Sequence, residues 1–455
     1  MPGILPRPAR FPQPARAALL LAAAALLAGC STINALIPGR TPPAPLGTPG
    51  HVTGFLGGAV ADEPRAAIVA REILSAGGSA VDAAVAGAFA MTVTLPSRAG
   101  LGGGGSCLVF SARQRQVVNV SFPAGARSSL PPGVDRPAAV PMMARGLFLL
   151  HTRGGRLRFE QLIRPAEDLA RLGTEISRAF AEDLAAVAGP LLRDPQAQRV
   201  FGAPGGGPLQ AGERMTQLDL GATLAQLRSA GVGEMYQGQL AARLEAGSAV
   251  AGGGLTLAEL RAARAEAIEP VRVGIGNDIA FFPAASVDGG AGTAAAFQAI
   301  MAGGPPPLGA GLVGASAGLI TMDQDGNAVA CAFSMNNLFG TGRVVAETGI
   351  LLAAAPGLGA VPPAPLAVAL ATSRDLRQFR AAAAGTGQQA AGAAAAGALA
   401  AALRRAPLTE AFAAVPEPGR SLLITCPAYA PGGNASCAAA ADPRGGGVAI
   451  GSFAR

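Results

Sequence analysis

Ser316 is the residue whose sequence context most directly indicates nucleophilic chemistry. It stands in the stretch GASAG, residues 314–318, which has the pattern G-x-S-x-G. In α/β-hydrolases this pattern places a serine on a strand-to-helix turn, and a histidine later in the chain accepts its proton. Both histidines of this chain, His51 and His151, precede Ser316. The required order is absent, and the pattern itself is weak in a chain with 64 glycines.

The composition indicates a packed globular protein. The chain has 455 residues, of which half are hydrophobic and 14% are charged, enough for one large core or two domains. It contains no lysine, and its net charge is +7. Three arginines lie in residues 1–29, which hold no acid, so the remainder carries about +4. This charge is too small to indicate a nucleic-acid partner. Two histidines and unclustered cysteines argue against a metal site, and no cofactor is expected.

The beginning of the chain is typical of a bacterial lipoprotein leader. A basic start precedes the apolar run AALLLAAAALLAGC, residues 17–30, which is too short for an ordinary membrane span. The run ends in Leu-Ala-Gly-Cys, which resembles a lipobox. We therefore expect removal of residues 1–29, lipidation of Cys30 and anchoring in the cell envelope, facing the periplasm or outward. A plain secretory signal is the alternative. Residues 30–53 are rich in Pro and Gly and are expected to form a tether.

Four further cysteines follow the leader. Cys426 and Cys437 flank the turn-rich loop PAYAPGGNAS and form a candidate disulfide, which an extracytoplasmic location permits. Cys107 and Cys331 lie in apolar, strand-like runs and are expected to be separate buried thiols.

The elements that must position Ser316 alternate between helices and strands, which indicates a layered α/β fold. Helices are expected at 64–76 and 80–92, and helical periodicity extends over 145–190, 216–265 and the alanine-rich stretch 381–404. Strands are expected on both sides of a polar turn at 113–116, at 319–322 and 328–334 around the turn DQDGN, and in RSLLITC and GGVAIGS.

Several of these strings together resemble the γ-glutamyltranspeptidase family. They include AGGSAVDAAVAGAFAMTVTLPSRAGLGGGG, TQLDLGATLAQLRSAGVGEMYQGQLA, DQDGNAVACAFSMNNLFGTG and ADPRGGGVAIG, and the likeness runs in order over about residues 54–452. The resemblance implies an Ntn-hydrolase fold, an αββα sandwich in which two stacked sheets lie between helix layers. It also implies that residues 54–315 correspond to a large subunit and residues 316–455 to a small subunit of the same domain.

The resemblance gives Ser316 a different role from the one rejected above. Members of the family cut themselves before a residue seven positions upstream of the first aspartate of the hairpin, which here is Ser316. Cleavage between Ala315 and Ser316 would create an α-amine with a pKa of roughly 7.7–8.0, which can serve as the base for the hydroxyl. No histidine is then needed. The resemblance further places the hydroxyl that hydrogen-bonds the nucleophile on Ser334 and a substrate-binding amide on Asn336.

Other positions of the family pattern are absent. Pro123 stands at the place of the arginine for the substrate carboxylate, and Arg127 is the nearby candidate replacement. The expected acidic loop reads AAAPGLGA, residues 353–360. Ala367 and Val368 stand where the family has a serine pair, and Ala317-Gly318 stand where it has a threonine and a histidine. The glycine pair of the family is only blurred here, at 385–389. These changes remove the charged partners of a zwitterionic glutamyl group.

Three functions are therefore open from the sequence. The first is a γ-glutamyltransferase-like Ntn hydrolase that acts on glutathione or another small amide or peptide and consists of two chains after self-cleavage. The second is a family member that has lost catalysis and retains a binding or envelope role. The third is a related acylase with an apolar substrate, which the alanines in the expected acidic loop favour over glutamyl transfer. Processing separates the second from the others, and the charge of the substrate separates the first from the third.

Overall fold

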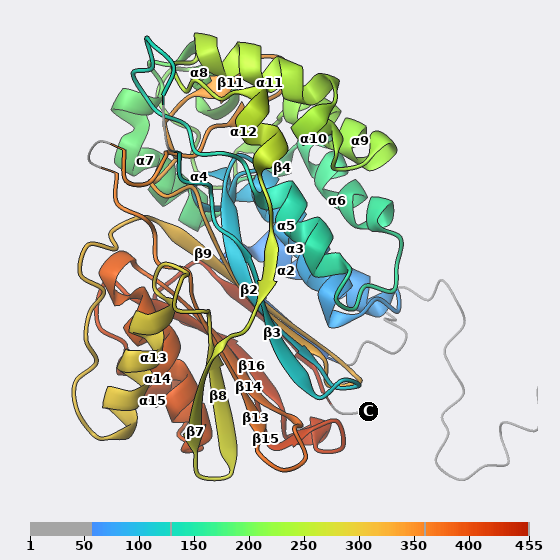
Figure 1. Cartoon of the computed structure of the whole chain (residues 1–455), viewed down its shortest axis with the longest axis vertical. Coiled ribbons are helices and arrows are strands. Elements are labelled where there is room, and N and C mark those ends of the chain that lie inside the picture. The colour runs from blue at the N-terminus through green and yellow to red at the C-terminus, as the bar shows by residue number, and fades with distance from the viewer. Residues whose placement is uncertain (1–56, 128–129, 359–360, 454–455) are drawn as a thin grey trace, which may run out of the picture. The chain divides into compact units, whose positions relative to one another are not determined.

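Two antiparallel sheets lie face to face between layers of helices in the computed structural model, which describes residues 57–127, 130–358 and 361–453 (Figure 1). All of these residues belong to one compact unit, Phe55–Arg455. The αββα sandwich expected from the sequence is confirmed. The leader, Cys30 and the expected tether lie outside the described residues.

The first sheet has seven strands in the order β17-β1-β9-β10-β2-β3-β6. Their bounds are Val448–Ser452, Gly57–Ala61, Ser316–Asp323, Ala328–Ser334, Gly104–Ser111, Gln116–Phe122 and Glu266–Ile268. The second sheet has six strands in the order β16-β15-β14-β13-β8-β7. Their bounds are Ala438–Ala441, Arg420–Ala430, Phe379–Thr386, Ala367–Ser373, Asp278–Phe282 and Val271–Ile275. Two short pairs, β4 with β5 (Thr174–Glu175, Arg214–Met215) and β11 with β12 (Val344–Val345, Ile350–Leu351), lie outside the sheets.

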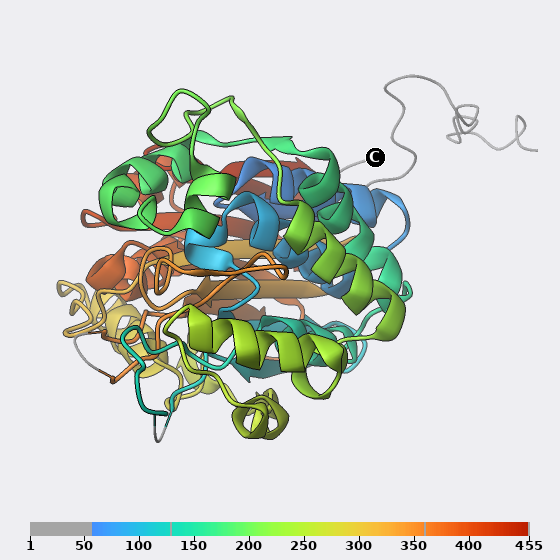
Figure 2. The same cartoon turned by 90° about the horizontal axis from the view of Figure 1, so that it is seen from above.

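Helices cover the outer face of each sheet. Those on the side of the second sheet are α13 (Gly290–Met301), α14 (Ala391–Leu403) and α15 (Leu408–Ala413). Against the first sheet pack α2 (Pro64–Ser75), α3 (Ala80–Thr94), α4 (Pro96–Ala99) and α5 (Met143–His151), with α6 (Phe159–Leu172) behind α3. The remaining helices are α7 (Arg178–Leu191), α8 (Pro195–Phe201), α9 (Leu218–Ala230), α10 (Glu234–Gln237), α11 (Gln239–Val250) and α12 (Leu257–Ala262). Helices α8 to α12 gather at one end of the sheets, from which Figure 2 views the molecule.

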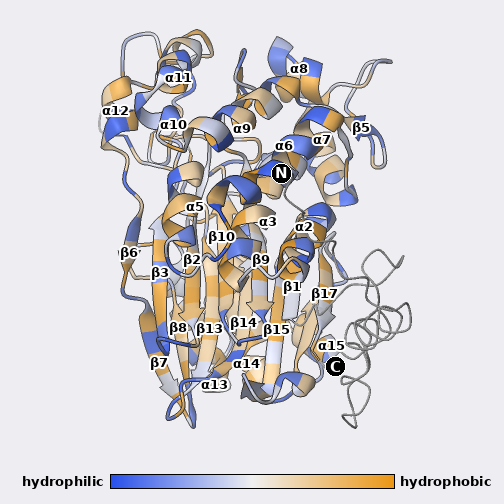
Figure 3. Ribbon diagram, turned by 90° about the vertical axis from the view of Figure 1, so that its right-hand side faces the viewer, coloured by the Kyte–Doolittle hydropathy of each residue, from blue (hydrophilic) through white to orange (hydrophobic). Residues whose placement is uncertain are grey.

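The side-chain pattern of β9 explains why this strand lies at the centre. Its residues are buried on both faces. Ala317 and Leu319 face the helix layer, whereas Ile320 and Met322 belong to the core between the sheets. A strand covered on both faces carries a continuous apolar run instead of an alternating one. Figure 3 shows hydrophobic residues along both sheets, and hydrophilic residues mixed with hydrophobic ones on outer helices such as α8 and α12.

Helix α3 carries apolar residues on all sides, and it is surrounded by α2, α5, α6 and the first sheet. All fifteen of its residues are buried. Ser79 and Asp82 form a capping box that satisfies its first amides. Among the helices of the described residues, none combines the length and the apolar character needed to cross a bilayer.

Two expectations from the sequence are wrong. Residues 381–404 are not one helix, because Ala381–Ala384 lie in β14 and α14 begins at Ala391. Pairing of β14 with β13 and β15, and burial on both faces, outweigh the helix propensity of alanine here. Cys107 and Cys331 are directly opposite each other on β2 and β10 and form a disulfide instead of separate thiols.

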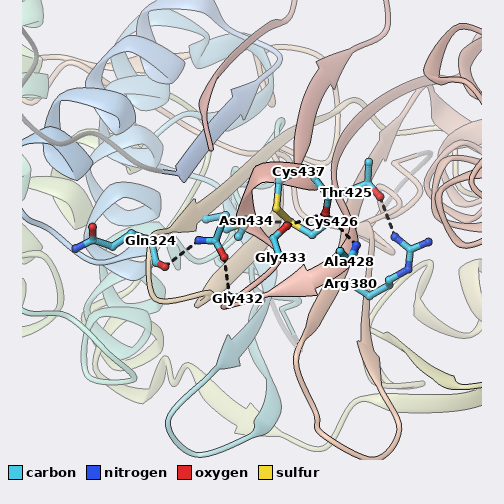
Figure 4. Close-up of a disulfide and its surroundings, with 11 residues drawn as sticks. Gln324, Arg380, Thr425, Cys426, Ala428, Gly432, Gly433, Asn434 and Cys437 are labelled. Atoms are coloured by element: carbon cyan, nitrogen blue, oxygen red, sulfur yellow. Dashed lines mark hydrogen bonds between the residues drawn. A yellow bond between two sulfur atoms is a disulfide. The ribbon is translucent and has the colours of Figure 1, made fainter. Parts of the chain in front are cut away.

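A second disulfide joins Cys426 in β15 to Cys437 (Figure 4). The loop that it closes contains the 3₁₀ helix η3 (Asn434–Ser436), and the Asn434 amide donates to the carbonyl of Gln324 in the β9–β10 turn. The bridge therefore closes the last hairpin of the second sheet, and Asn434 in its loop links it to the hairpin that begins with Ser316.

Candidate active site

Ser316 is the first residue of β9 and is buried, with 2% of its surface exposed. It lies directly opposite Ser334, the last residue of β10. Within the described part of the chain, the Ser316 hydroxyl has no hydrogen-bond partner. A buried hydroxyl without a partner is unusual, because such groups are normally satisfied. No described residue therefore engages the Ser316 hydroxyl.

The hydroxyl of Ser334 contacts the peptide bond before Ser316 and not the Ser316 hydroxyl. Its Oγ donates to the carbonyl oxygen of Ala315 at 2.6 Å. The backbone N–H of Asn336 donates to the same Oγ at 2.7 Å, which orients the hydroxyl proton toward Ala315. In the intact chain Ser334 thus polarises the carbonyl that Ser316 would attack, a contact that differs from the one the resemblance implies.

Asn336 is engaged by the main chain. Its backbone is left-handed, with φ of 62°, and the residue is buried, with 7% of its surface exposed. The amide Nδ2 donates to the carbonyl oxygen of Ala354 at 2.9 Å. The alanine loop that stands where an acidic loop was expected therefore occupies the amide of Asn336.

Ser316 and Ala315 line a cavity of about 380 Å³ at the end of β9. Its walls come from both sheets and from α4 and α7, and they include Asp62, Arg98, Asp183, Thr386, Gly387 and Gln388. The last three belong to the stretch 385–389, where the glycine pair of the family pattern is only weakly recognisable in the sequence. Among the described residues, this lining includes neither Pro123 nor the alanine loop. The open space beside Ser316 is thus on a different side from the positions that the resemblance indicates for a glutamyl group.

Arg127 is a structural residue and does not replace the missing substrate arginine. Its side chain has no exposed surface. Its Nε donates to Glu259 at 2.7 Å, and its Nη1 donates to the carbonyl oxygen of Gly253 at 2.8 Å. It lines a separate cavity of about 470 Å³ together with Pro123, and Ser316 does not line that cavity.

The sequence patterns do not predict the charged groups that lie beside Ser316. Asp62 follows β1, and its Oδ2 accepts a hydrogen bond from the Gly318 N–H at 2.7 Å. Arg98, in α4 just before the glycine run, is held by Asp183 through its Nε at 2.7 Å and through its Nη2. The Ser97 hydroxyl also donates to Asp183. No local pattern marks Asp62, because the pairing of β1 with β9 is what brings it beside Gly318.

Burial raises the pKa of the Asp62 carboxyl to about 6, although the Gly318 N–H and the charge of Arg98 oppose the shift. Since this value lies above the ordinary 3.8, the fold favours the protonated form. The resulting stabilisation is fully present below pH 3.8 and is lost as the pH rises through 6.

Asp62→Asn is therefore expected to stabilise the protein at pH 8 and to change its stability little at pH 4. A shift of this size corresponds to at most about 3 kcal/mol in the free energy of unfolding, reduced by the partial exposure of the side chain. The measurement is thermal or denaturant unfolding at both pH values, with Ser316→Ala in both proteins so that neither can cleave itself. A less stable Asp62→Asn protein at pH 8 would contradict this assignment.

Comparison with known proteins identifies a matching family model and several similar proteins. The family model described as Gamma-glutamyltranspeptidase matches residues 66–301, slightly more than half of the chain. The Acylase ACY 1 proenzyme of Pseudomonas sp. (strain SE83) is 33% identical over 241 residues, which cover 48% of this chain and 43% of that proenzyme. The Glutathione hydrolase proenzyme of Bacillus subtilis (strain 168) is 32% identical over 214 residues, which cover 43% of this chain and 36% of that proenzyme. The matches thus span less than half the length of these two curated relatives.

One solved structure resembles nearly the whole chain. The crystal structure of cephalosporin acylase from Bacillus halodurans superposes with a TM-score of 0.69 at 18% identity. The match covers 90% of this chain and 99% of that one. At this identity the similarity shows a common fold alone.

Proposed function

The chain belongs to the gamma-glutamyltranspeptidase family, and from this premise we propose that it is a self-processing N-terminal nucleophile amide hydrolase with Ser316 as its nucleophile. One observation carries the proposal. The free Ser316 hydroxyl lies beside an Ala315 carbonyl that already accepts a hydrogen bond from Ser334. The Ala315–Ser316 peptide bond thus has an oxyanion donor at its carbonyl and a nucleophile in the residue that follows, the two groups that acyl transfer requires.

The processing reaction uses only this peptide bond and water. The Ser316 Oγ attacks the Ala315 carbonyl carbon, and the negative charge that develops on the oxygen is stabilised by the Ser334 hydroxyl. The C–N bond breaks, the proton from Oγ passes to the nitrogen of Ser316, and an ester joins Ala315 to the Ser316 side chain. Water hydrolyses this ester and leaves a carboxylate on Ala315 and a free α-amine on Ser316. The products are residues 30–315 and 316–455, held together as one folded unit.

The preferred substrate, we propose, is an acyl amide without the charged head of a γ-glutamyl group. Pro123 and the alanine loop offer no charge, Arg127 is engaged in structural contacts, and Asn336 is bonded to Ala354. The relatives include a protein named as an acylase as well as one named as a glutathione hydrolase.

Glutathione is accordingly expected to be a poor substrate. We expect kcat/KM for glutathione to be at least about 100-fold below that of the best uncharged acyl amide, since each charge-assisted hydrogen bond contributes about 1.5–3 kcal/mol. The measurement compares γ-glutamyl, 4-carboxybutanoyl and pentanoyl p-nitroanilides. The first two differ only by the α-amine, and the last two differ only by a methyl group in place of the carboxylate. A preference for the γ-glutamyl compound would overturn the proposed substrate class.

We also propose that the mature protein is anchored in the bacterial envelope through lipid on Cys30. The support is the basic start, the apolar run and the Leu-Ala-Gly-Cys ending of the leader. Wild-type protein is expected to enter the detergent phase on partitioning and to carry the mass of the lipid. Cys30→Ala should remain uncleaved or become soluble, and a wild-type protein that is soluble without detergent and has no added mass would contradict the anchor.

A further inference from the structure

The backbone of β9 turns one edge toward β1 at the point where β1 ends. The N–H and the C=O of Gly318 both face Asp62, because the Asp62 N–H donates to the Gly318 carbonyl at 3.1 Å and the Asp62 carboxylate accepts from the Gly318 N–H. Alternate residues of a strand present their backbone groups to the same edge. The N–H of Ser316, two residues earlier, therefore faces this edge too. The register of β1 ends with Ala61 opposite Leu319, so β1 does not reach Ser316.

The carboxylate of Asp62 lies along this edge beside Gly318, two residues from Ser316. A Cβ atom built on Gly318 would lie 3.5 Å from Asp62 Oδ2, which places the carboxylate over the face that Gly318 shares with the Ser316 side chain. Asp62 and Ser316 line the same cavity. Oδ2 is used by Gly318, whereas Oδ1 accepts no hydrogen bond from any described residue.

We propose that Asp62 is the positioning residue for the α-amine of Ser316 that self-cleavage creates, which completes a carboxylate–amine–hydroxyl relay. The inference rests on the proposed function. In this relay the amine accepts the proton of Ser316 Oγ as the oxygen attacks the substrate acyl carbon, and Asp62 holds the resulting ammonium. The ammonium then protonates the leaving nitrogen as the C–N bond breaks, and water hydrolyses the acyl ester by the same proton path. The order is that of a catalytic triad, in which a third group orients the base.

Gly318 makes room for this arrangement. A Cβ atom there would lie 2.9 Å from Ala384 Cβ and 3.0 Å from Leu422 Cδ1, both in the second sheet. Such distances are too short for a side chain without movement of the neighbours. A larger residue at 318 would therefore occupy the face on which the Asp62 carboxylate approaches Ser316.

The charges around Asp62 leave it available as the partner of a cation. The charged side chains that surround it or line the same cavity are Arg98, Glu182, Asp183, Arg420, Asp442 and Arg444. Arg98 is bound through two nitrogens by Asp183, and Arg444 by Asp442. Arg420 is bound by Glu417. The three arginines thus have carboxylate partners other than Asp62, whereas the carboxylate of Asp62 is bonded only to a backbone N–H among the described residues. Since burial raises its pKa only to about 6, Asp62 is largely ionised at pH 8.

The absence of lysine allows a direct test. In the cleaved protein the only amines are the α-amines of the two chains. The pH dependence of Ser316 carbamylation by cyanate, followed by mass spectrometry of the 316–455 chain, therefore gives the pKa of this amine without a substrate. An opposite charge within about 4–6 Å shifts a pKa by about one unit or more. We expect Asp62→Asn to lower the pKa of the Ser316 amine by about one unit. The acid limb of the kcat/KM profile should move to lower pH with it, and kcat should fall at least tenfold.

Glu63→Gln is the matched control. Glu63 is the next residue and, like Asp62, has a raised pKa, but it is buried and bonds the Ala66 N–H and the Thr94 hydroxyl instead of lining the cavity. It should leave the amine pKa unchanged. Asp62→Glu, which keeps the charge, should retain a raised amine pKa and is the second variant if Asp62→Asn cleaves poorly.

The outcomes separate the two proposals. Cleaved Asp62→Asn protein with a wild-type amine pKa, or an equal shift in Glu63→Gln, would overturn the relay and leave the proposed function intact. If the amine pKa of Asp62→Glu falls as low as that of Asp62→Asn, the relay would also be overturned. A wild-type chain that never cleaves would overturn both.

Discussion

Replacing Ser316 with alanine should leave the protein as one uncut chain without amide hydrolase activity. Alanine lacks the Oγ that attacks the Ala315 carbonyl, so neither the ester nor the α-amine can form. Wild-type protein should show two bands on a denaturing gel, and sequencing of the smaller fragment should begin at Ser316. Activity on the best acyl p-nitroanilide should fall to background, since both the nucleophile and its base are lost.

Ser316→Thr is the matched variant, because it keeps the hydroxyl and adds one methyl group. It should cleave at least as well as the wild type. A wild-type chain that stays intact after long incubation at neutral pH would leave Ser316 only as a relic of the nucleophile position. The protein would then be a family member without catalysis, and the alternative of a binding or envelope role would take the place of the hydrolase.

The part of the fold that could be predicted is the part with strong local patterns. Proline near the start of α2, glycine after its end and the apolar run of α3 gave two helices whose ends differ from the structure by two residues at most. The turn DQDGN between apolar runs gave the β9–β10 hairpin, although β9 begins three residues earlier than expected. This early start matters, because Ser316 is the residue that opens the strand.

The parts of the fold and of the site that could not be predicted depend on contacts between segments far apart in the sequence. The alanines of β14 have no strand pattern, and only their burial between β13 and β15 makes them a strand. The disulfide between Cys107 and Cys331 spans 224 residues of sequence and required the β2–β10 register, which no local pattern fixes. In the same way, Asp62 is 256 residues from Gly318, so its place at the site could not be read from the chain.

Ser334→Ala is expected to slow self-cleavage by about 100- to 1,000-fold, which corresponds to the roughly 2.7–4 kcal/mol lost with one oxyanion donor. The reason is the hydrogen bond of 2.6 Å from Ser334 Oγ to the Ala315 carbonyl, which strengthens as negative charge develops on that oxygen. The measurement is the rate at which purified precursor converts to two chains. Ser334→Thr retains the donor and should cleave much faster than Ser334→Ala.

The matched control for this loss is Ser421→Ala. Ser421 is also a buried strand serine, and its hydroxyl donates to a main-chain carbonyl, that of Ala394, at 2.8 Å, outside the site. Each alanine variant loses a hydrogen bond that contributes about 1 kcal/mol to stability, so both should unfold somewhat more easily. Only Ser334→Ala should lose the cleavage rate, because only its hydroxyl faces the carbonyl that is attacked. Equal rates for the two variants would mean that the Ser334 bond stabilises the intact chain as much as the transition state, and a different group would then have to supply the oxyanion donor.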